Sequence, residues 1–119
     1  MRQPDDAALL VDILIAAQDA RAMAVGVTYG DLLEARKLQL ALVKLIEIMG
    51  EAVGRLSDHV RDSVPEVAWR KVTGMRHRLV HDYGNINYHI VLDVVRDDLP
   101  NLIAALEPLV PSDEPEGQS

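Results

Sequence analysis

The 119-residue sequence has no cysteine and no phenylalanine, and aromatic residues make up only 3% of it. Without cysteine the chain has neither disulfides nor thiolate chemistry, which fits a cytoplasmic location. A membrane-spanning helix needs about 18 consecutive apolar residues. No apolar run in the sequence approaches this length, so no membrane-spanning helix is expected. The N-terminus, MRQPDDAALL, places two acidic residues before its apolar stretch and lacks a small-residue cleavage site, so no signal peptide is expected either.

Basic residues are outnumbered by acidic ones: the chain has 12 lysines and arginines against 19 aspartates and glutamates, a formal net charge of −7. A broad nucleic-acid-binding surface is normally basic, so this balance argues against one. A small cationic site remains compatible with it, since salt screens surface charges over about 10 Å.

The length and composition indicate one helical domain. Apolar residues make up 49% of the chain and are mainly leucine, valine, isoleucine and alanine, as in helices that pack on helices. We expect the domain to span residues 1–110. The tail at 111–119, PSDEPEGQS, is too polar to bury apolar area and is predicted to be a disordered acidic segment.

Apolar spacing predicts helices over residues 6–24, 28–56, 63 to 81–83, and 87–106. Thr28 with Asp31, and Ser63 with Glu66, have the spacing of N-terminal caps. Gly84 is predicted to stop the third helix, and Pro100 to kink the fourth. No segment alternates with a period of two, so the predicted fold is all-α, an up-down four-helix bundle with short connections.

The second predicted helix is apolar nearly all round over LQLALVKLIEIMGEAV. Such a helix must be covered on most sides, and three other helices in a domain this small can hardly do so. We therefore expect a second copy of the chain to complete the burial, giving a homodimer.

The segment WRKVTGMRHRLVH, residues 69–81, is cationic within an acidic chain. It holds no acidic residue and carries Arg70, Lys71, Arg76 and Arg78 with two histidines. The helix dipole favours cations at a helix C-terminus, which accounts for Arg78 and His81 but poorly for Arg70 and Lys71. The surplus charge favours an anion site, for example for a phosphodiester.

Arg76 and His81 are five positions apart, a separation of roughly 140° on a regular helix. The two side chains cannot easily meet one small ligand from a regular helix. Either the helix distorts near its end, or the site combines groups from two chains across a symmetry axis.

A metal site is the rival interpretation, because His77 and His81 are four apart on one helical face. Asp82 or His89 could add ligands. Against it, the neighbouring Arg76 and Arg78 would repel a cation, so neither a metal nor another cofactor is assigned.

Two longer stretches, LIEIMGEAVGRLS and VPEVAWRKVTGMRHRLVHDYGNINYHIVLDVVRDDLPNL, resemble the HepT-like proteins of the HEPN superfamily. The resemblance covers about residues 5–108. Its signature is arginine, four residues, histidine, one residue and tyrosine, which here is Arg76, His81 and Tyr83. It implies a four-helix HEPN fold that dimerises and a metal-independent endoribonuclease that acts as a toxin.

The resemblance also implies a partner, a small MntA-like nucleotidyltransferase antitoxin. In characterised members this partner modifies the signature tyrosine with AMP, and by position that tyrosine is Tyr83. One departure from the family pattern bears on rate, on substrate choice and on activity itself: the residue after the signature arginine is commonly asparagine or aspartate, and here it is His77.

These residues support a hypothesis for RNA cleavage. Arg76 would hold the scissile phosphate and His81 would transfer a proton, with His77 or His81 of the partner subunit completing the acid–base pair. The remaining cations, Arg78 and Lys71, would guide flanking phosphates. The alternatives are a catalytically inactive HEPN dimer that binds and supports a nucleotidyltransferase, and a helical dimerisation protein whose basic cluster only caps a helix.

Overall fold

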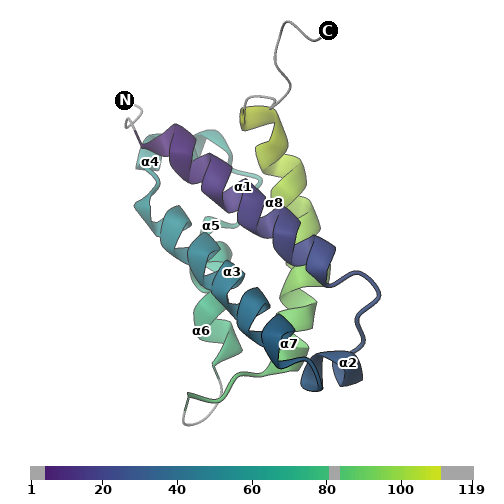
Figure 1. Cartoon of the computed structure of the whole chain (residues 1–119). Coiled ribbons are helices and arrows are strands. Elements are labelled where there is room, and N and C mark those ends of the chain that lie inside the picture. Colours follow the sequence, from purple (N-terminus) through teal and green to yellow (C-terminus); the bar gives the residue numbers. More distant parts are fainter. Residues whose placement is uncertain (1–4, 81–83, 111–119) are drawn as a thin grey trace, which may run out of the picture.

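The structure, a computed structural model, describes residues 5–80 and 84–110 (Figure 1). These residues are largely helical and contain no β-strand, apart from one isolated antiparallel bridge between Val80 and Ile86. The predicted all-α fold class is therefore confirmed over the described residues. None of the helices in these ranges combines the length and the apolar character needed to cross a membrane. The tail predicted at 111–119 lies outside the described residues.

The core forms around α1 (Asp6–Met23), α3 (Arg36–Arg55) and α8 (Leu99–Leu106). In Figure 1, α1 and α3 lie side by side and run in opposite directions, with α8 passing behind α1. Each helix buries apolar residues spaced three or four apart, as a helix with one inward face must: Leu10, Ile13 and Ala17 on α1, Leu42, Ile46 and Met49 on α3, and Leu99, Leu102 and Leu106 on α8. The helix predicted at 6–24 is confirmed.

The predicted cap at Thr28 is confirmed and begins α2 (Tyr29–Leu33). The Thr28 hydroxyl accepts a hydrogen bond from the Asp31 backbone N–H at 3.0 Å. In return, the Asp31 carboxylate accepts one from the Thr28 backbone N–H at 3.0 Å. The two residues thus satisfy backbone donors reciprocally, as in a capping box.

The prediction of one continuous helix over 28–56 is wrong, because the chain breaks between α2 and α3. The buried amide of Gln39 bridges the break. Its Nε2 donates to the carbonyl of Leu32 at 2.9 Å and to that of Leu33 at 3.2 Å. The Leu32 carbonyl also accepts from the Ala35 backbone N–H at 3.2 Å, so the Gln39 amide adds to the hydrogen bonds that close the C-terminus of α2.

The prediction that a helix starts at Ser63 is also wrong. Ser63 is the last residue of α4 (Asp58–Ser63), where its hydroxyl donates to the Val60 carbonyl at 2.6 Å. The residue that caps α4 is Ser57, whose hydroxyl accepts from the Val60 backbone N–H at 3.3 Å. The next helix begins only at Trp69, whose indole N–H donates back to the Arg61 carbonyl at 2.9 Å.

The cationic segment forms two short helices, α5 (Trp69–Thr73) and α6 (Met75–Leu79), joined at Gly74. The predicted end at His81 or Tyr83 is wrong, because α6 ends at Leu79 and Val80 is extended. Gly84, the predicted stop, has a positive φ of 80°, which glycine adopts readily. The chain then returns to the end of α6, where the Asn87 N–H donates to the Leu79 carbonyl at 2.8 Å.

The fourth predicted helix begins at Asn87 as expected. The Asn87 side chain caps α7 (Tyr88–Asp93) by accepting from the N–H groups of His89 and Ile90. A π-helical turn (Val94–Asp98) then leads into α8, and a short 3-10 turn (Glu107–Leu109) follows. The kink predicted at Pro100 stays a prediction. The π-helical turn ends two residues before Pro100, which lacks a backbone N–H and crowds the preceding turn.

Candidate nucleic-acid interface

The cationic helices α5 and α6 pack on α3. Their charged side chains pair with Glu47 of α3 and with Asp98 of the π-helical turn that precedes α8. On the α3 side the backbones come close at Gly50, where an added Cβ would meet the carbonyl oxygens of Thr73 and Val72 at 3.5 and 3.6 Å. Glycine at this position lets α5 approach α3 closely.

The signature arginine is paired with α3. The Nε of Arg76 donates to Oε2 of Glu47 at 2.9 Å, and the Arg76 side chain is 62% exposed. This bond uses one of the five N–H donors of the guanidinium, so the two terminal amino groups keep their donors for another acceptor. Glu47 therefore fixes one edge of the arginine without occupying the fork that matches a phosphate.

The two other predicted cations, Lys71 and Arg78, share one carboxylate of the π-helical turn before α8. Lys71 Nζ lies 3.0 Å from Asp98 Oδ1, and Arg78 Nη1 lies 2.9 Å from Asp98 Oδ2. The Asp98 side chain is only 13% exposed. The segment at 69–80 is free of acids in sequence, but Glu47 and Asp98 bring acids to it in space.

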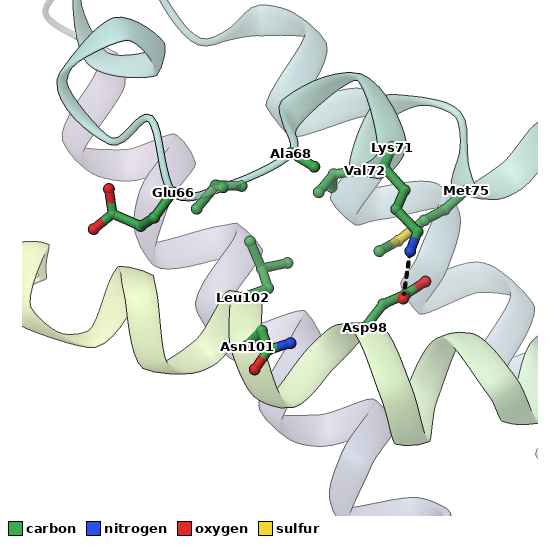
Figure 2. Close-up of a pocket in the computed structure, with 9 residues that line it drawn as sticks. Glu66, Ala68, Lys71, Val72, Met75, Asp98, Asn101 and Leu102 are labelled. Carbon is green, nitrogen blue, oxygen red and sulfur yellow. Dashed lines mark ion pairs between the residues drawn. The ribbon is translucent and has the colours of Figure 1, made fainter.

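Figure 2 shows the Lys71–Asp98 pair at the edge of a pocket between α5 and α8. The pocket has a volume of about 150 Å³. Apolar side chains separate this ion pair from Glu66 at the opposite edge, and the lining comprises Glu66, Val67, Ala68, Lys71, Val72, Met75, Asp98, Asn101 and Leu102.

Two further hollows run along the exposed side of α3 and share Glu47. One is lined by Arg76 with Gly50, Glu51 and Thr73, and the other by Leu40, Val43, Ile86 and Tyr88 with polar neighbours. Leu40 is 54% exposed, and Val43 and Ile48 are only partly buried. The predicted incomplete covering of this helix is thus confirmed within the single chain.

The other predicted site residues fall into two groups. His77 is exposed on α6. His81 and Tyr83 lie outside the described residues, as does Asp82. Since α6 ends at Leu79, the roughly 140° separation of a regular helix does not apply between Arg76 and His81.

His89, considered above as a metal ligand, stacks on Tyr29 with ring centroids 3.4 Å apart and an interplanar angle of 12°. The stacked pair joins α7 to α2. Among residues 5–80 and 84–110, no three histidine, aspartate or glutamate side chains gather as a set that could hold a metal ion.

Most of the chain matches one protein family. The model of the family described as "Ribonuclease HepT-like" matches residues 13–109. The chain belongs to the HepT-like ribonuclease family. The resemblance read from the signature is therefore confirmed, and the match spans every helix described above except the first turns of α1.

Individual HepT-like relatives agree with this assignment. "Putative RNase MJ0127" of Methanocaldococcus jannaschii is 32% identical over 119 residues, which cover 100% of this chain and 98% of that protein. "Putative RNase TTE0752" of Caldanaerobacter subterraneus is 34% identical over 65% of this chain and 69% of its own length. "Probable ribonuclease HepT" of Thermococcus cleftensis is 30% identical over 70% of this chain and 76% of its own. No solved structure matches the chain significantly.

Sequence reasoning missed two acidic residues of this candidate site. Glu47 is 29 positions from Arg76, and Asp98 is 20 positions from Arg78. The only local signal for Asp98 was its place in the stretch DDLPNL, which contributed to the resemblance but indicated no contact. Glu47 lay within a helix that was assigned to the core and the dimer.

Proposed function

We propose that this HepT-like protein is a metal-independent endoribonuclease that acts as a toxin, with Arg76 and His81 as its catalytic residues. The observation that carries the proposal is the pairing of Arg76 with Glu47 through Nε alone, in a chain whose family model matches over residues 13–109. A guanidinium held by one edge offers its two amino groups to two oxygens of a phosphodiester.

The proposed reaction uses the ribose 2′-hydroxyl as nucleophile. Its oxygen attacks phosphorus while a base takes its proton, and the bond from phosphorus to the 5′-oxygen breaks as an acid protonates the leaving oxygen. His81 serves at one of these steps, and His77 or His81 of the partner subunit serves at the other. Arg76 stabilises the charge that develops on the phosphate oxygens. The products are a 2′,3′-cyclic phosphate and a 5′-hydroxyl.

The proposal includes an up-down four-helix protomer and a homodimer. The four legs are α1, α2 with α3, α5 with α6, and α7 with α8. The hollow on the exposed side of α3 is lined by Leu40 and Val43 of α3 and by Ile86 and Tyr88, and it adjoins the hollow that contains Arg76. A second copy covering this side would remove apolar surface from water and bring two signature segments to one interface.

Silencing would come from a nucleotidyltransferase antitoxin that adds AMP to Tyr83. The tyrosine oxygen attacks the α-phosphorus of ATP and pyrophosphate leaves, so the modification needs no other reactant. Tyr83 is two residues from His81, so the AMP adds bulk and negative charge beside the catalytic histidine. The site is proposed to work in the cytoplasm, where RNA and ATP are present.

The second candidate is a catalytically inactive HEPN dimer that binds and supports a nucleotidyltransferase. Two observations favour it: His77 follows the signature arginine, and Glu47 and Asp98 offset the positive charge of Arg76, Lys71 and Arg78. It predicts binding to the transferase with no growth arrest on induced expression.

The test is cleavage of RNA by purified protein in excess chelator. Parent protein is expected to cut. Both Arg76→Ala, which removes a group that stabilises charge, and His81→Ala, which removes an acid–base group, are expected to lose about 100-fold or more in rate. His59→Ala is the matched control, because His59 is exposed on α4. Equal cutting by all four proteins would refute the catalytic assignment, and no cutting or growth arrest by the parent would select the inactive dimer.

A further inference from the structure

Asp98 lies where three segments meet. It belongs to the π-helical turn before α8, and each of its two carboxylate oxygens forms an ion pair with one cation, Lys71 of α5 or Arg78 of α6. The carboxylate is mostly buried, whereas the two cationic side chains are 53% and 38% exposed. A carboxylate thus joins two cations that face solvent on their other sides.

The two oxygens of the Asp98 carboxylate bind Lys71 and Arg78 as two oxygens of a phosphodiester would. Lysine and arginine side chains are both common phosphate ligands. We propose that Lys71 and Arg78 form an anion subsite for an RNA phosphate, and that Asp98 occupies it as an internal competitor. The proposal rests on the proposed ribonuclease function and adds that Asp98 regulates RNA binding.

Glu47 and Asp98 affect the cations differently: Glu47 orients Arg76, whereas Asp98 occupies the phosphate-binding groups of Lys71 and Arg78. Glu47 takes only the Nε of Arg76 and leaves the terminal amino groups. Asp98 instead takes a terminal amino group of Arg78 and the single ammonium of Lys71. With the carboxylate in place the trio carries a charge of +1, and without its charge the pair carries +2.

Displacement of Asp98 by RNA is feasible on the strength of the pairs. Water and salt weaken the two pairs from the side of the exposed cations, whereas freeing the mostly buried carboxylate carries a desolvation cost that one weakly held phosphate does not offset. A phosphate that arrives with a neighbouring phosphate held at Arg76 can therefore replace the carboxylate, and the subsite discriminates against ligands with a single weakly held phosphate.

The experiment measures binding of a single-stranded RNA oligonucleotide to His81→Ala protein, which is not expected to cut it. Asp98→Asn is expected to tighten binding about fivefold or more at about 0.1 M salt. It is also expected to steepen the dependence of log affinity on log salt by about 0.7 to 1.4, the contribution of one to two freed cations on a single strand. A change of fold stability alone would not steepen this slope.

The matched control is Asp97→Asn, which makes the same change of net charge at the neighbouring exposed residue and leaves the Asp98 pairs intact. It is expected to change affinity by less than about twofold. Equal gains in Asp97→Asn and Asp98→Asn would overturn the proposal, since net charge alone would then explain them.

A second set of variants tests whether the gain in affinity depends on Lys71 and Arg78. In protein carrying Lys71→Gln and Arg78→Gln, Asp98→Asn is expected to give no gain, and a gain that persists there would overturn the proposal. Asp98→Ser repeats the test should the asparagine variant fail to fold. If parent protein cuts RNA but Asp98 variants bind no better than Asp97→Asn, the subsite fails and the ribonuclease stands; if the parent neither binds nor cuts RNA, both fail.

Discussion

Arg76 Nε and Glu47 Oε2 lie 2.9 Å apart, so the signature arginine on α6 is held by a carboxylate on α3. Glu47→Gln is expected to lower the rate of RNA cleavage about tenfold, because a neutral amide orients the guanidinium less firmly and misplacement of a positioning group by about 1 Å can cost more than this. Stability should change by no more than about 1 kcal/mol, as for other exposed ion pairs. Cleavage rate and melting temperature are measured together.

Glu51→Gln is the control for Glu47→Gln. Glu51 is exposed on the same helix and lines the same hollow, and its substitution makes the same charge change. If the two variants cut RNA at equal rates, Glu47 has no specific role in positioning Arg76.

The exposed side of α3 is expected to be the dimer interface. Leu40→Glu places a charge on a leucine that is 54% exposed, and it should convert the dimer to monomer and abolish cleavage. Ile15→Glu on α1 is the matched control, because Ile15 is 50% exposed and its variant should remain dimeric and active. Light scattering after size-exclusion chromatography measures the mass, and a dimer that survives Leu40→Glu would place the interface elsewhere.

Tyr83 is expected to be the residue that the antitoxin modifies and not a catalytic residue. Tyr83→Phe removes only the hydroxyl that would accept AMP, so the variant should still arrest growth and should resist the cognate nucleotidyltransferase. Growth is measured with and without the transferase, and the mass of each protein reports the added AMP. Rescue of the phenylalanine variant by catalysis of the transferase, without tight binding to account for it, would contradict this role.

The capping box at Thr28 predicts a pH-dependent contribution to stability. The hydrogen bond from the Thr28 backbone, followed by that with the Thr28 side chain, lowers the pKa of Asp31 below its ordinary value of 3.8. A carboxyl whose pKa is lower in the folded state stabilises the fold above the unfolded pKa and loses this effect as the pH falls through the folded pKa. Asp31→Asn should therefore lower the melting temperature at pH 7, and the difference from parent should shrink as the pH falls below 3.8.

Asp19→Asn, an exposed change of the same charge on α1, controls for net charge in these melts. Thr28→Ala removes the cap from the other side and should cost about 1 kcal/mol. A difference between parent and Asp31→Asn that stays constant from pH 7 to below 3.8 would show that the carboxylate charge plays no part.

Local signals in the sequence predicted the features that local chemistry determines. The apolar spacing of α1, the Thr28–Asp31 cap and the start of the last helical stretch at Asn87 all depend on residues within a few positions of one another. The all-α class followed for the same reason, because helical periodicity is a short-range pattern.

The features that the sequence did not predict depend on distant contacts. The break before α3 contains neither glycine nor proline, and it is stabilised by the buried Gln39 amide. Ser63 and Glu66 have the spacing of a cap, yet Trp69 bonds to Arg61 and the helix starts later. The pairing of Glu47 with Arg76 and of Asp98 with Arg78 joins residues 29 and 20 positions apart, which no local pattern encodes.

The ends of the RNA fragments test the proposed chemistry most directly. Parent protein in excess chelator is expected to leave 2′,3′-cyclic phosphate and 5′-hydroxyl ends, and a single 2′-deoxy nucleotide at the cut site should stop cleavage there, because the nucleophile is gone. Mass spectrometry of the fragments reads both results. Fragments with 3′-hydroxyl and 5′-phosphate ends, or continued cutting at the deoxy position, would contradict a reaction driven by the 2′-hydroxyl with Arg76 and His81.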